Sequence, residues 1–401
     1  MGLTIDAKKI LLQKRLLQDI KRKSKDEKKK ILDEYINLTG FHRKYAISKI
    51  NSCIKRRTHV FNNKTITSCK VEIPKKKKRI YIPKYDDVFK ATLIAIWSYF
   101  DYMCGQRLVP FIRENIAELA KVKTFRITDI IKEKLLTISS ATVNRLLKEP
   151  RKKNRLHGIS TTKAGTSLNK LIPIRVFFDW DERVPGFFEI DTVSHDGGNA
   201  SGEHIYSLTV TDVSVGWTEI RPLLNKAQRW VKEGIEDIKN CLPYKMLGID
   251  SDNGSEFKNY QLYKWCEDNE ITFTRGRSYK KNDNCFVEQK NNSVVRHLVG
   301  YYRYEGEEAL KELQTLYKLW CLLVNYFYPS MKILEKERKD AHIYKKYDIA
   351  KTPYKRCLES DKLSDEEKQK LIKIKEELNI VELKKNVEQA LNNVLKYVGL
   401  G

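Results

Sequence analysis

Three acidic residues of this sequence stand where their carboxylates can share metal ions. Asp191 and Asp252 each end an apolar, strand-like stretch, and Glu288 lies in the first turns of a helical segment. Strand ends of an open α/β sheet form ligand sites, so residues 61 and 36 positions apart can converge there. Three carboxylates without a Lys or Arg partner repel one another. Divalent cations such as Mg²⁺, which prefer hard oxygen ligands, relieve this repulsion.

A shared metal site predicts phosphoryl transfer, although the same residues have simpler interpretations. Two ions about 3.5–4 Å apart can activate the attacking oxygen and stabilise the leaving oxygen of an in-line displacement. The stretch LGIDSDNGSEF is also typical of a strand that ends in a turn, because Asp-Asn-Gly is a common turn signal. Glu189 and Asp250 lie two residues before Asp191 and Asp252 on the same strand faces. Each either approaches the metal site or is an outward or supporting acid.

The positive charge of the chain is concentrated in its first 170 residues. This part carries 41 Lys and Arg against 15 Asp and Glu, whereas residues 171–401 carry 36 against 37. The formal net charge of +25 therefore arises from the N-terminal part. Such a charge block predicts a polyanion partner, most simply DNA or RNA. An anionic membrane surface would also attract it, but no basic amphipathic helix with an aromatic apolar face stands out.

Length, apolar runs and cysteines narrow the class of protein. A chain of 401 residues is long enough for two or three domains with their own cores. The sequence has no run of about eighteen apolar residues and no signal-peptide core, so we expect a cytoplasmic, nucleoid-associated protein with no membrane partner. The eight cysteines include no pair at C-x-x-C spacing, which predicts reduced thiols and argues against a structural zinc site.

Two segments of the basic region read as pairs of helices joined by a tight turn. In residues 24–57, apolar side chains at helical spacing break at Gly40 and then resume. In residues 126–153, Ser139 or Ser140 can cap the second helix of the pair. A helix-turn-helix reads DNA with its second helix, but paired helices are also ordinary packing units. Both interpretations stay open for each segment taken alone.

A basic run at residues 75–79, bracketed by prolines, lies between these helical segments. It is either a solvated loop or a wing or strand pair that follows the phosphate backbone. The residues that we predict to contact DNA are the basic and amide side chains of these segments and of the stretch that follows them, namely Arg43, Lys44, Lys49, Lys75, Lys76, Lys77, Lys78, Arg79, Asn144, Arg145, Lys148, Arg151, Lys152 and Lys153.

From about residue 171 the pattern changes to alternating strands and helices. Five strands with interspersed helices predict a mixed α/β sheet against which the helices pack. The expected organisation is all-α helix-turn-helix DNA-binding domains, an α/β catalytic core and a helical C-terminal region in which a short coiled coil is one arrangement. The expected segments are a helix-turn-helix region at 1–70, a basic loop with a second helix-turn-helix-like domain at 71–150, a basic linker at 151–172, the core at 173–330 and the C-terminal region at 331–401.

The acidic residues lie in motifs that resemble those of retroviral-integrase-type transposases. The sequence reads EID at 189–191, SDNGSEF at 251–257 and FVEQKN at 286–291, with 35 residues between Asp252 and Glu288. The segments GWTEI, KAQRWV and KTPYKRCL resemble bacterial insertion-sequence transposases of this group, as does the N-terminal ILDEYINLTGFHRKYAI. The resemblance therefore spans most of the chain and weakens after about residue 358.

The resemblance implies a ribonuclease H-like core in which Asp191, Asp252 and Glu288 hold two Mg²⁺ ions, with Mn²⁺ as a substitute. Members of the family cut phosphodiester bonds at the ends of an element with water, and then use the freed 3′-hydroxyl to attack target DNA. The implied partners are double-stranded DNA, as terminal repeats and as target, and further copies of the chain on paired ends. Two alternatives stay open: a ribonuclease H-like nuclease without strand transfer, and a non-catalytic DNA-binding regulator derived from a transposase.

The sequence departs from the retroviral pattern in two respects. It has no His-His-Cys-Cys zinc domain, so recognition of the ends is expected of the helix-turn-helix units. Near the helical face of Glu288, only Arg296 is cationic among the neighbouring positions. Arg296 is therefore one further predicted DNA contact.

Neutralising Lys75 to Arg79 should weaken binding to all DNA sequences alike. It should also flatten the salt dependence of binding, because a protein that contacts fewer phosphates displaces fewer counterions from DNA when it binds. Titrations of labelled duplexes at several salt concentrations measure both effects. An unchanged salt slope would return this run to the solvated-loop interpretation.

Overall fold

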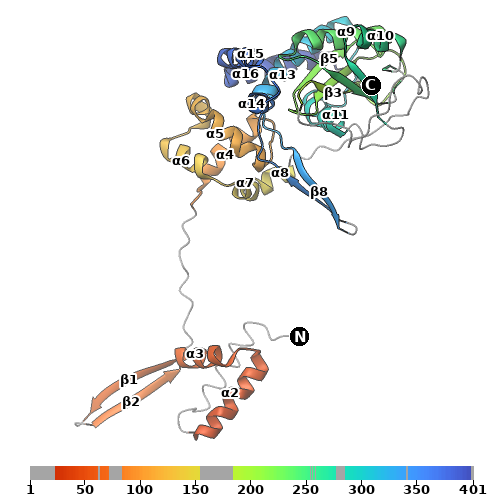
Figure 1. The fold of residues 1–401 in the computed structure, drawn as a ribbon. Coiled ribbons are helices and arrows are strands. Elements are labelled where there is room, and N and C mark those ends of the chain that lie inside the picture. Colours follow the sequence, from red (N-terminus) through yellow and green to blue (C-terminus); the bar gives the residue numbers. More distant parts are fainter. Residues whose placement is uncertain are drawn as a thin grey trace. The chain divides into compact units, whose positions relative to one another are not determined.

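The chain forms two compact units, residues 1–84 and 85–401 (Figure 1). The computed structural model describes residues 23–61, 64–71, 84–153, 184–252, 254, 256–257, 259–276, 285–339 and 342–398. The basic run at 75–79 and nearly all of the linker expected at 151–172 lie outside these residues, and their roles stay predictions. Among the described helices, none is both long enough and apolar enough to cross a membrane.

The first unit contains a pair of helices followed by an antiparallel ribbon. Its elements are α2 (Lys25–Thr39), α3 (Arg43–Cys53), β1 (Ile54–Phe61) and β2 (Lys64–Val71). Ser24 and Glu27 form a reciprocal capping box that begins α2. Gly40 ends that helix at φ 67°, a left-handed conformation that glycine adopts without steric cost, and its N–H donates to the carbonyl of Ile36. The expected helix pair is therefore present. The prediction of an all-α region at 1–70 is wrong for β1 and β2, which form a strand pair before the basic run.

The second unit opens with a bundle of short helices. These are α4 (Asp87–Tyr99), α5 (Gly105–Lys121), η1 (Lys123–Phe125), α6 (Asp129–Thr137), α7 (Ser140–Leu146) and α8 (Lys148–Lys153). Asp86, Thr128 and Ser139 cap α4, α6 and α7, and each side chain accepts a hydrogen bond from a backbone N–H of the first turn. The expected capping of α7 is therefore made by Ser139.

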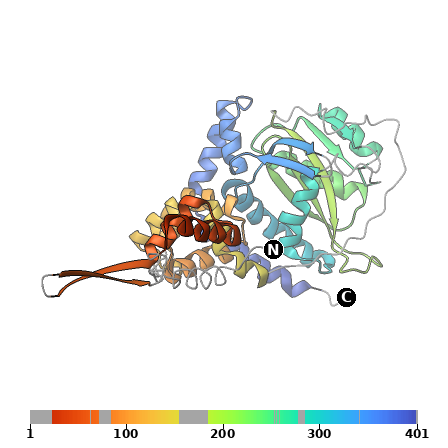
Figure 2. The same ribbon diagram turned by 90° about the horizontal axis from the view of Figure 1, so that it is seen from below.

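A mixed sheet forms the centre of the second unit (Figure 2). Its five strands are β3 (Phe187–Ser194), β4 (Tyr206–Asp212), β5 (Thr218–Leu223), β6 (Gly248–Ser251) and β7 (Thr272–Arg275), in the order β5-β4-β3-β6-β7. The three strands on the β5 side are antiparallel, whereas β6 and β7 run parallel to β3. The prediction of a mixed five-stranded sheet is confirmed.

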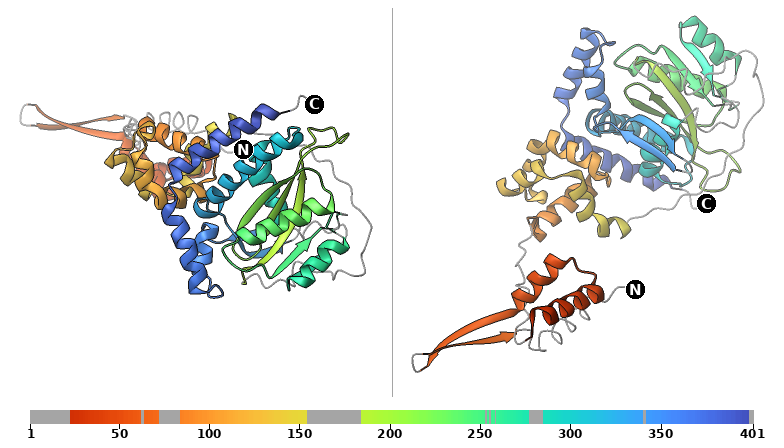
Figure 3. Two further views of the ribbon diagram at one scale, coloured as in Figure 1. Left: turned by 90° about the horizontal axis from the view of Figure 1, so that it is seen from above. Right: turned by 60° about the horizontal axis from the view of Figure 1, so that its bottom comes forward.

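Helices cover both faces of this sheet (Figure 3). They include α9 (Gln228–Cys241), α10 (Tyr260–Asp268) and α13 (Gly306–Phe327). Leu208 of β4 lies against Gly234 of α9, where an added Cβ would stand 3.0 Å from the leucine side chain. The adjacent Ser207 instead contacts Tyr317 of α13 through its hydroxyl, at 2.6 Å. Because neighbouring residues of a strand point to opposite faces, α9 and α13 lie on opposite sides of the sheet.

The C-terminal region, expected to be helical, contains a β-hairpin. Strands β8 (Ile333–Lys339) and β9 (His342–Tyr347) pair antiparallel, and α14 (Pro353–Glu359), α15 (Asp365–Glu377), α16 (Ile380–Val394) and η4 (Leu395–Tyr397) follow. The helical prediction is therefore wrong for residues 333–347. Leu334 is 60% exposed and Tyr344 58%. The described side chains of these strands are exposed on both faces, so they lack the alternation of buried apolar and exposed polar residues that indicates a strand.

The bundle, the sheet and the C-terminal helices pack into one unit, although they were expected as separate segments. Arg107 of α5 donates through Nε to the carbonyl of Pro329 at 2.5 Å. Lys384 of α16 lies 2.8 Å from the carboxylate of Asp101, which follows α4. Helix α16 also packs along α13, so its apolar face belongs to the core and not to a coiled coil with α15.

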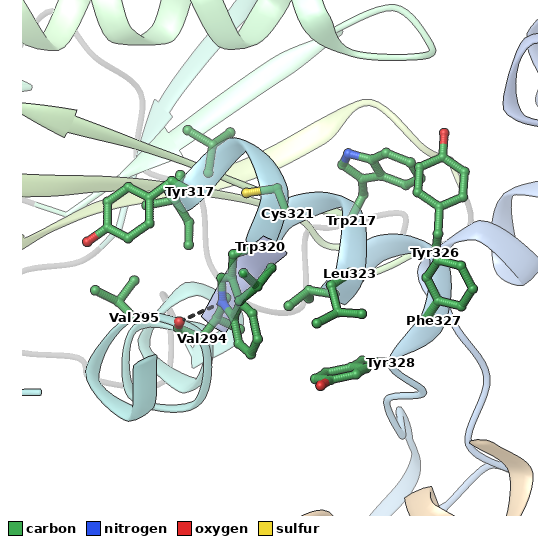
Figure 4. Close-up of a cluster of buried hydrophobic side chains, with 14 of the residues drawn as sticks. Trp217, Val294, Val295, Tyr317, Trp320, Cys321, Leu323, Tyr326, Phe327 and Tyr328 are labelled. Atoms are coloured by element: carbon green, nitrogen blue, oxygen red, sulfur yellow. Dashed lines mark hydrogen bonds between the residues drawn. The ribbon is translucent and has the colours of Figure 1, made fainter. Parts of the chain in front are cut away.

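Helix α13 supports the helical segment that carries Glu288 (Figure 4). That segment runs through α11 (Cys285–Lys290), the π-helical turn η3 (Asn291–Arg296) and α12 (His297–Val299). The indole N–H of Trp320 in α13 donates to the carbonyl of Val294 in η3 at 2.9 Å. Trp320 is 3% exposed and Val294 is 5% exposed. A buried aromatic side chain with its one polar group satisfied stabilises this contact.

Replacing Trp320 with Ala should lower the free energy of unfolding by about 3–5 kcal/mol, because a large buried ring is lost and a cavity remains. Trp320→Phe keeps most of the ring and should cost less, with about 1 kcal/mol from the lost hydrogen bond. Urea unfolding followed by circular dichroism measures both changes. Equal losses in the two variants would show that ring packing contributes little at this position.

Candidate active site

The pairing of β3 with β6 brings Asp191 and Asp252 side by side. The two strands are parallel, and Ile190 lies opposite Ser251 at the last pair of their register. Asp191 is the next residue of β3, and Asp252 directly follows the last residue of β6, so the two are adjacent along this register. Asp191 is half-buried, whereas Asp252 is exposed. Asp252 thus follows the end of β6, as expected, whereas the prediction that Asp191 ends its strand is wrong, because β3 continues to Ser194.

Asp191 and Asp252 define the acidic edge of the sheet, which Glu288 joins from α11. Its negative charge, like those of Asp252 and Glu256, contributes to raising the pKa of Asp191. Burial is the largest cause of that shift, and together these effects raise the pKa of Asp191 from 3.8 to about 8. The backbone N–H of Thr192 donates to Asp191 at 2.7 Å and opposes the shift. Asp191 therefore lies in an electrostatically unfavourable environment to which Asp252 and Glu288 both contribute.

Glu256 is a fourth carboxylate at this edge that sequence reasoning missed. The hydroxyl of Thr192 donates to its Oε1 at 3.2 Å. A Cβ built on Gly254 would stand 2.8 Å from Oδ1 of Asp252 and 2.8 Å from Oε2 of Glu256, so both carboxylates flank this glycine. Glu256 lies only four residues after Asp252 in the SDNGSEF motif. A turn at Gly254 that folds the chain back was the signal that could have indicated it.

Asn291 is a second residue that sequence reasoning did not identify. Its Nδ2 donates to Oδ2 of Asp191 at 2.7 Å. Asn291 is the first residue of the π-helical turn η3, three positions after Glu288. Helical π-turns often occur at functional sites, because the extra residue redirects the side chains that follow. Asn291 therefore holds one oxygen of Asp191 in place.

Glu189 and Asp250 lie one step further into the sheet than the other acids. They face each other in the β3–β6 register and are each 1% exposed. Oε2 of Glu189 accepts hydrogen bonds from the backbone N–H groups of Phe286 and Val287, both at 2.8 Å. Asp250 accepts a hydrogen bond from the hydroxyl of Thr274 on β7. Burial raises the pKa of Glu189 well above its ordinary value, and the charge of Asp250 adds to this.

The acidic edge has the donor chemistry that a divalent cation requires. Its carboxylates offer hard oxygen ligands, and a cation would offset the repulsion that raises the pKa of Asp191. In the described part of the chain, no three His, Cys, Asp or Glu side chains are already placed to hold one ion together. Asp252 and Glu288 are exposed, and Oδ1 of Asp252 accepts a hydrogen bond from the N–H of Gly254 at 2.7 Å.

Three of the basic residues that the sequence assigned to DNA lie on α3 of the first unit. Lys44 and Arg43 are exposed on α3, and Arg43 also forms an ion pair with Asp33 of α2. Lys49 is half-buried, with its Nζ 5.7 Å from the ring centre of Tyr45. The three residues thus share one short helix, the second of the helix pair.

The predicted contacts in the second unit divide into exposed and internally bonded residues. Arg145, Lys148 and Lys152 are exposed on α7 and α8. Asn144 instead accepts a hydrogen bond from the N–H of Gly105 at 2.9 Å and another from Arg151 at 2.8 Å. The structure therefore uses Asn144 and Arg151 to pack α7 and α8 against α5. Nothing in the spacing of α7 distinguished this inward position from its outward neighbours.

Arg296 also makes internal contacts. Its Nη2 donates to the carbonyl of Ser194 at the end of β3 at 2.7 Å, and its guanidinium lies 4.6 Å from the ring centre of Tyr301. Lys290, on the same helical segment, donates to the carbonyl of Gly216 at 3.2 Å. Burial, with the nearby charges of two arginines, lowers the pKa of Lys290 to about 7. Both cations fasten the helical segment to the sheet, a position that differs from the outward one expected of Arg296.

Between about pH 4 and pH 8, Asp191 should make a contribution to the free energy of unfolding that falls as the pH rises. Unfolded Asp191 releases its proton near pH 3.8, whereas the folded residue holds it to about pH 8, so the folded chain binds more protons in this window. The free energy of unfolding of Asp191→Asn, relative to that of the parent, should therefore be higher at pH 8 than at pH 5. Urea unfolding with a chelator present measures the difference, and an equal effect at both pH values would contradict it.

Some known proteins are similar to this chain in sequence or in structure. No protein-family model matches the chain. Similar solved structures include the catalytic core domain of BIV integrase, with 17% identity, a TM-score of 0.28 and coverage of 44% of this chain and 95% of that one. Another is the HTLV-2 integrase catalytic core domain in complex with magnesium, with 14% identity, a TM-score of 0.28 and coverage of 37% and 91%. TM-scores this low do not establish a shared fold over the chain.

A sequence relative covers much more of the chain. The uncharacterized protein y4rM of Sinorhizobium fredii (strain NBRC 101917 / NGR234) is 35% identical over 323 residues. The match covers 80% of this chain and 87% of that protein. This chain therefore belongs to the same protein family as y4rM.

Proposed function

We propose that this protein is a DNA transposase of the insertion-sequence type, with a ribonuclease H-like core that cleaves and joins DNA strands. One observation carries the proposal most directly. Asp191 and Asp252 are adjacent along the register of β3 and β6, and the charge of Glu288 contributes to raising the pKa of Asp191. This group is open to solvent at Asp252 and Glu288, so a DNA strand can approach it.

The proposed chemistry requires Asp191, Asp252 and Glu288 to bind divalent cations, two Mg²⁺ ions or Mn²⁺ in their place. When bound, such ions activate the attacking oxygen and stabilise the leaving oxygen of a phosphodiester. Asn291 orients Asp191 through the 2.7 Å hydrogen bond to Oδ2, which leaves Oδ1 toward Thr192. The attacking group is first water, which cuts at the end of the element, and then the freed 3′-hydroxyl, which attacks target DNA.

DNA binding is assigned to surfaces outside the acidic edge. The exposed Arg43 and Lys44 of α3, and the exposed Arg145 and Lys148 of α7 and α8, carry positive charge on the second helix of each pair. Such residues contact phosphates and base edges when a helix enters the major groove. We infer that these positions hold the terminal repeats, and that copies of the chain bind paired ends in the cytoplasm, at the nucleoid.

Asp252→Asn should abolish cleavage and strand transfer and leave binding of end DNA nearly unchanged, because the positive charge that binds DNA lies elsewhere. The assay mixes purified protein, Mg²⁺, labelled DNA from the gene's own flanks and a target plasmid. A matched control is Asp237→Asn on α9, which removes a carboxylate that pairs with Arg221 and lies outside the acidic group.

Three outcomes of this assay separate the candidate functions. Joined products that vanish in Asp252→Asn but persist in Asp237→Asn support the transposase. Nicking without joining favours a nuclease of the same fold. Binding with neither reaction, with Mn²⁺ and with both flanks tested, favours a DNA-binding regulator. Loss of end binding in a folded Asp252→Asn variant would contradict the separation of binding from catalysis.

A further inference from the structure

Glu189 joins the strand of Asp191 to the helical segment of Glu288. Its carboxylate is 1% exposed, and one oxygen, Oε2, accepts the backbone N–H groups of Phe286 and Val287, both at 2.8 Å. These are the second and third residues of α11. The first N–H groups of a helix have no partner within the helix and need one from outside it. Glu189 supplies that partner from two residues before Asp191.

The two hydrogen bonds to Glu189 and one to Asp191 lie on either side of Glu288 in the helical segment. Phe286 and Val287 precede Glu288 directly, and Asn291 follows it by three residues and donates to Asp191 at 2.7 Å. All three bonds end on β3. Hydrogen bonds on both sides of Glu288 therefore connect its helical segment to β3, and they set the position of Glu288 relative to Asp191.

Glu189 differs from the acids at the open edge in its burial and in the groups that it bonds. Glu189 lies opposite Asp250 and Thr211 in the sheet, where all three residues are 1% exposed. Asp252 and Glu288 are exposed. A carboxyl oxygen that accepts two backbone N–H groups, both at 2.8 Å, holds those groups in a fixed direction. The surroundings of Glu189 are those of a side chain that holds the helix.

We propose that Glu189 is a positioning residue, which sets the place of Glu288 in the metal-binding group without touching metal or substrate. The inference rests on the proposed function for its effect on activity. Its structural part, the docking of α11 on β3, stands on the two hydrogen bonds alone. Loss of such a supporting partner typically costs about 10- to 100-fold in metal affinity or activity.

Two substitutions at Glu189 separate positioning from metal binding. Glu189→Gln keeps a side-chain oxygen that can accept both N–H groups, whereas Glu189→Met has a similar length and no acceptor. Glu189→Met should lower the affinity for Mn²⁺ by about 10- to 100-fold. It should also speed hydrogen exchange of the amides of residues 286 and 287. Glu189→Gln should recover most of both properties, which a direct ligand would not.

Asp212→Leu is the matched control. Asp212 is also fully buried and accepts backbone N–H groups, from Gly186 at 2.7 Å and from Val215 at 2.9 Å. It follows Thr211, so it lies on the sheet face opposite to Glu189. Its loss should destabilise the fold without changing Mn²⁺ affinity or exchange in α11.

The experiment uses the full chain and measures calorimetric Mn²⁺ binding, hydrogen-exchange mass spectrometry of α11, and the rate of strand transfer at saturating DNA. A fall in rate with an unchanged KM for DNA is expected for Glu189→Met. Unchanged exchange and unchanged Mn²⁺ affinity in Glu189→Met would overturn the proposal. A Glu189→Gln variant as inactive as Asp252→Asn would overturn it as well, because Glu189 would then act as a ligand.

The two proposals fail in distinguishable ways. A parent protein with no strand transfer and no Mn²⁺ binding would refute the proposed function, while hydrogen exchange would still decide whether Glu189 docks α11. If Glu189→Met does not fold, Glu189→Gln decides: native exchange in α11 with near-parent Mn²⁺ affinity supports positioning, and the loss of either overturns it.

Discussion

The parallel pairing of β3 with β6 is the constraint on which the acidic edge depends. It aligns Asp191, which lies within β3 and is half-buried, with Asp252, which follows the end of β6. Like charges at such a separation are unfavourable, and burial makes them more so, which is why the pKa of Asp191 is raised to about 8. A fold keeps such a group only where its surroundings hold it rigidly, and clusters of this kind are typical of functional sites.

The surroundings supply that rigidity from several directions. The helical segment of Glu288 is bonded to the sheet through Glu189, Asn291 and Arg296, and to α13 through Trp320. Along β3 and β6, the acids therefore have two different roles. The inner row of acids is buried and fully engaged with backbone or hydroxyl donors, whereas the outer row is accessible. The same strand therefore both presents a carboxylate and holds the helix that presents another.

Sequence patterns predicted the sheet well because its strands are buried. Apolar runs at 187–191 and 246–251 correctly indicated strands of a mixed sheet, and a segment between them has the apolar spacing of a helix. The hairpin at 333–347 was missed because its exposed strands carry charges on both sides. Asn144 was assigned to DNA as a polar residue of the second helix of its pair, and Arg151 as part of the basic stretch that follows. Only packing against α5 shows that both point inward.

The sequence by itself determined the types of residue at the acidic edge, the strands and helix that carry them, and the uneven distribution of charge along the chain. Those properties are local, since they follow from spacing and composition over short windows. The tertiary structure alone decided which acids face outward, that Glu256 and Asn291 join Asp191, and that Glu189 holds α11. These are contacts between residues up to 100 positions apart, and they depend on strand register and helix packing that no local pattern specifies.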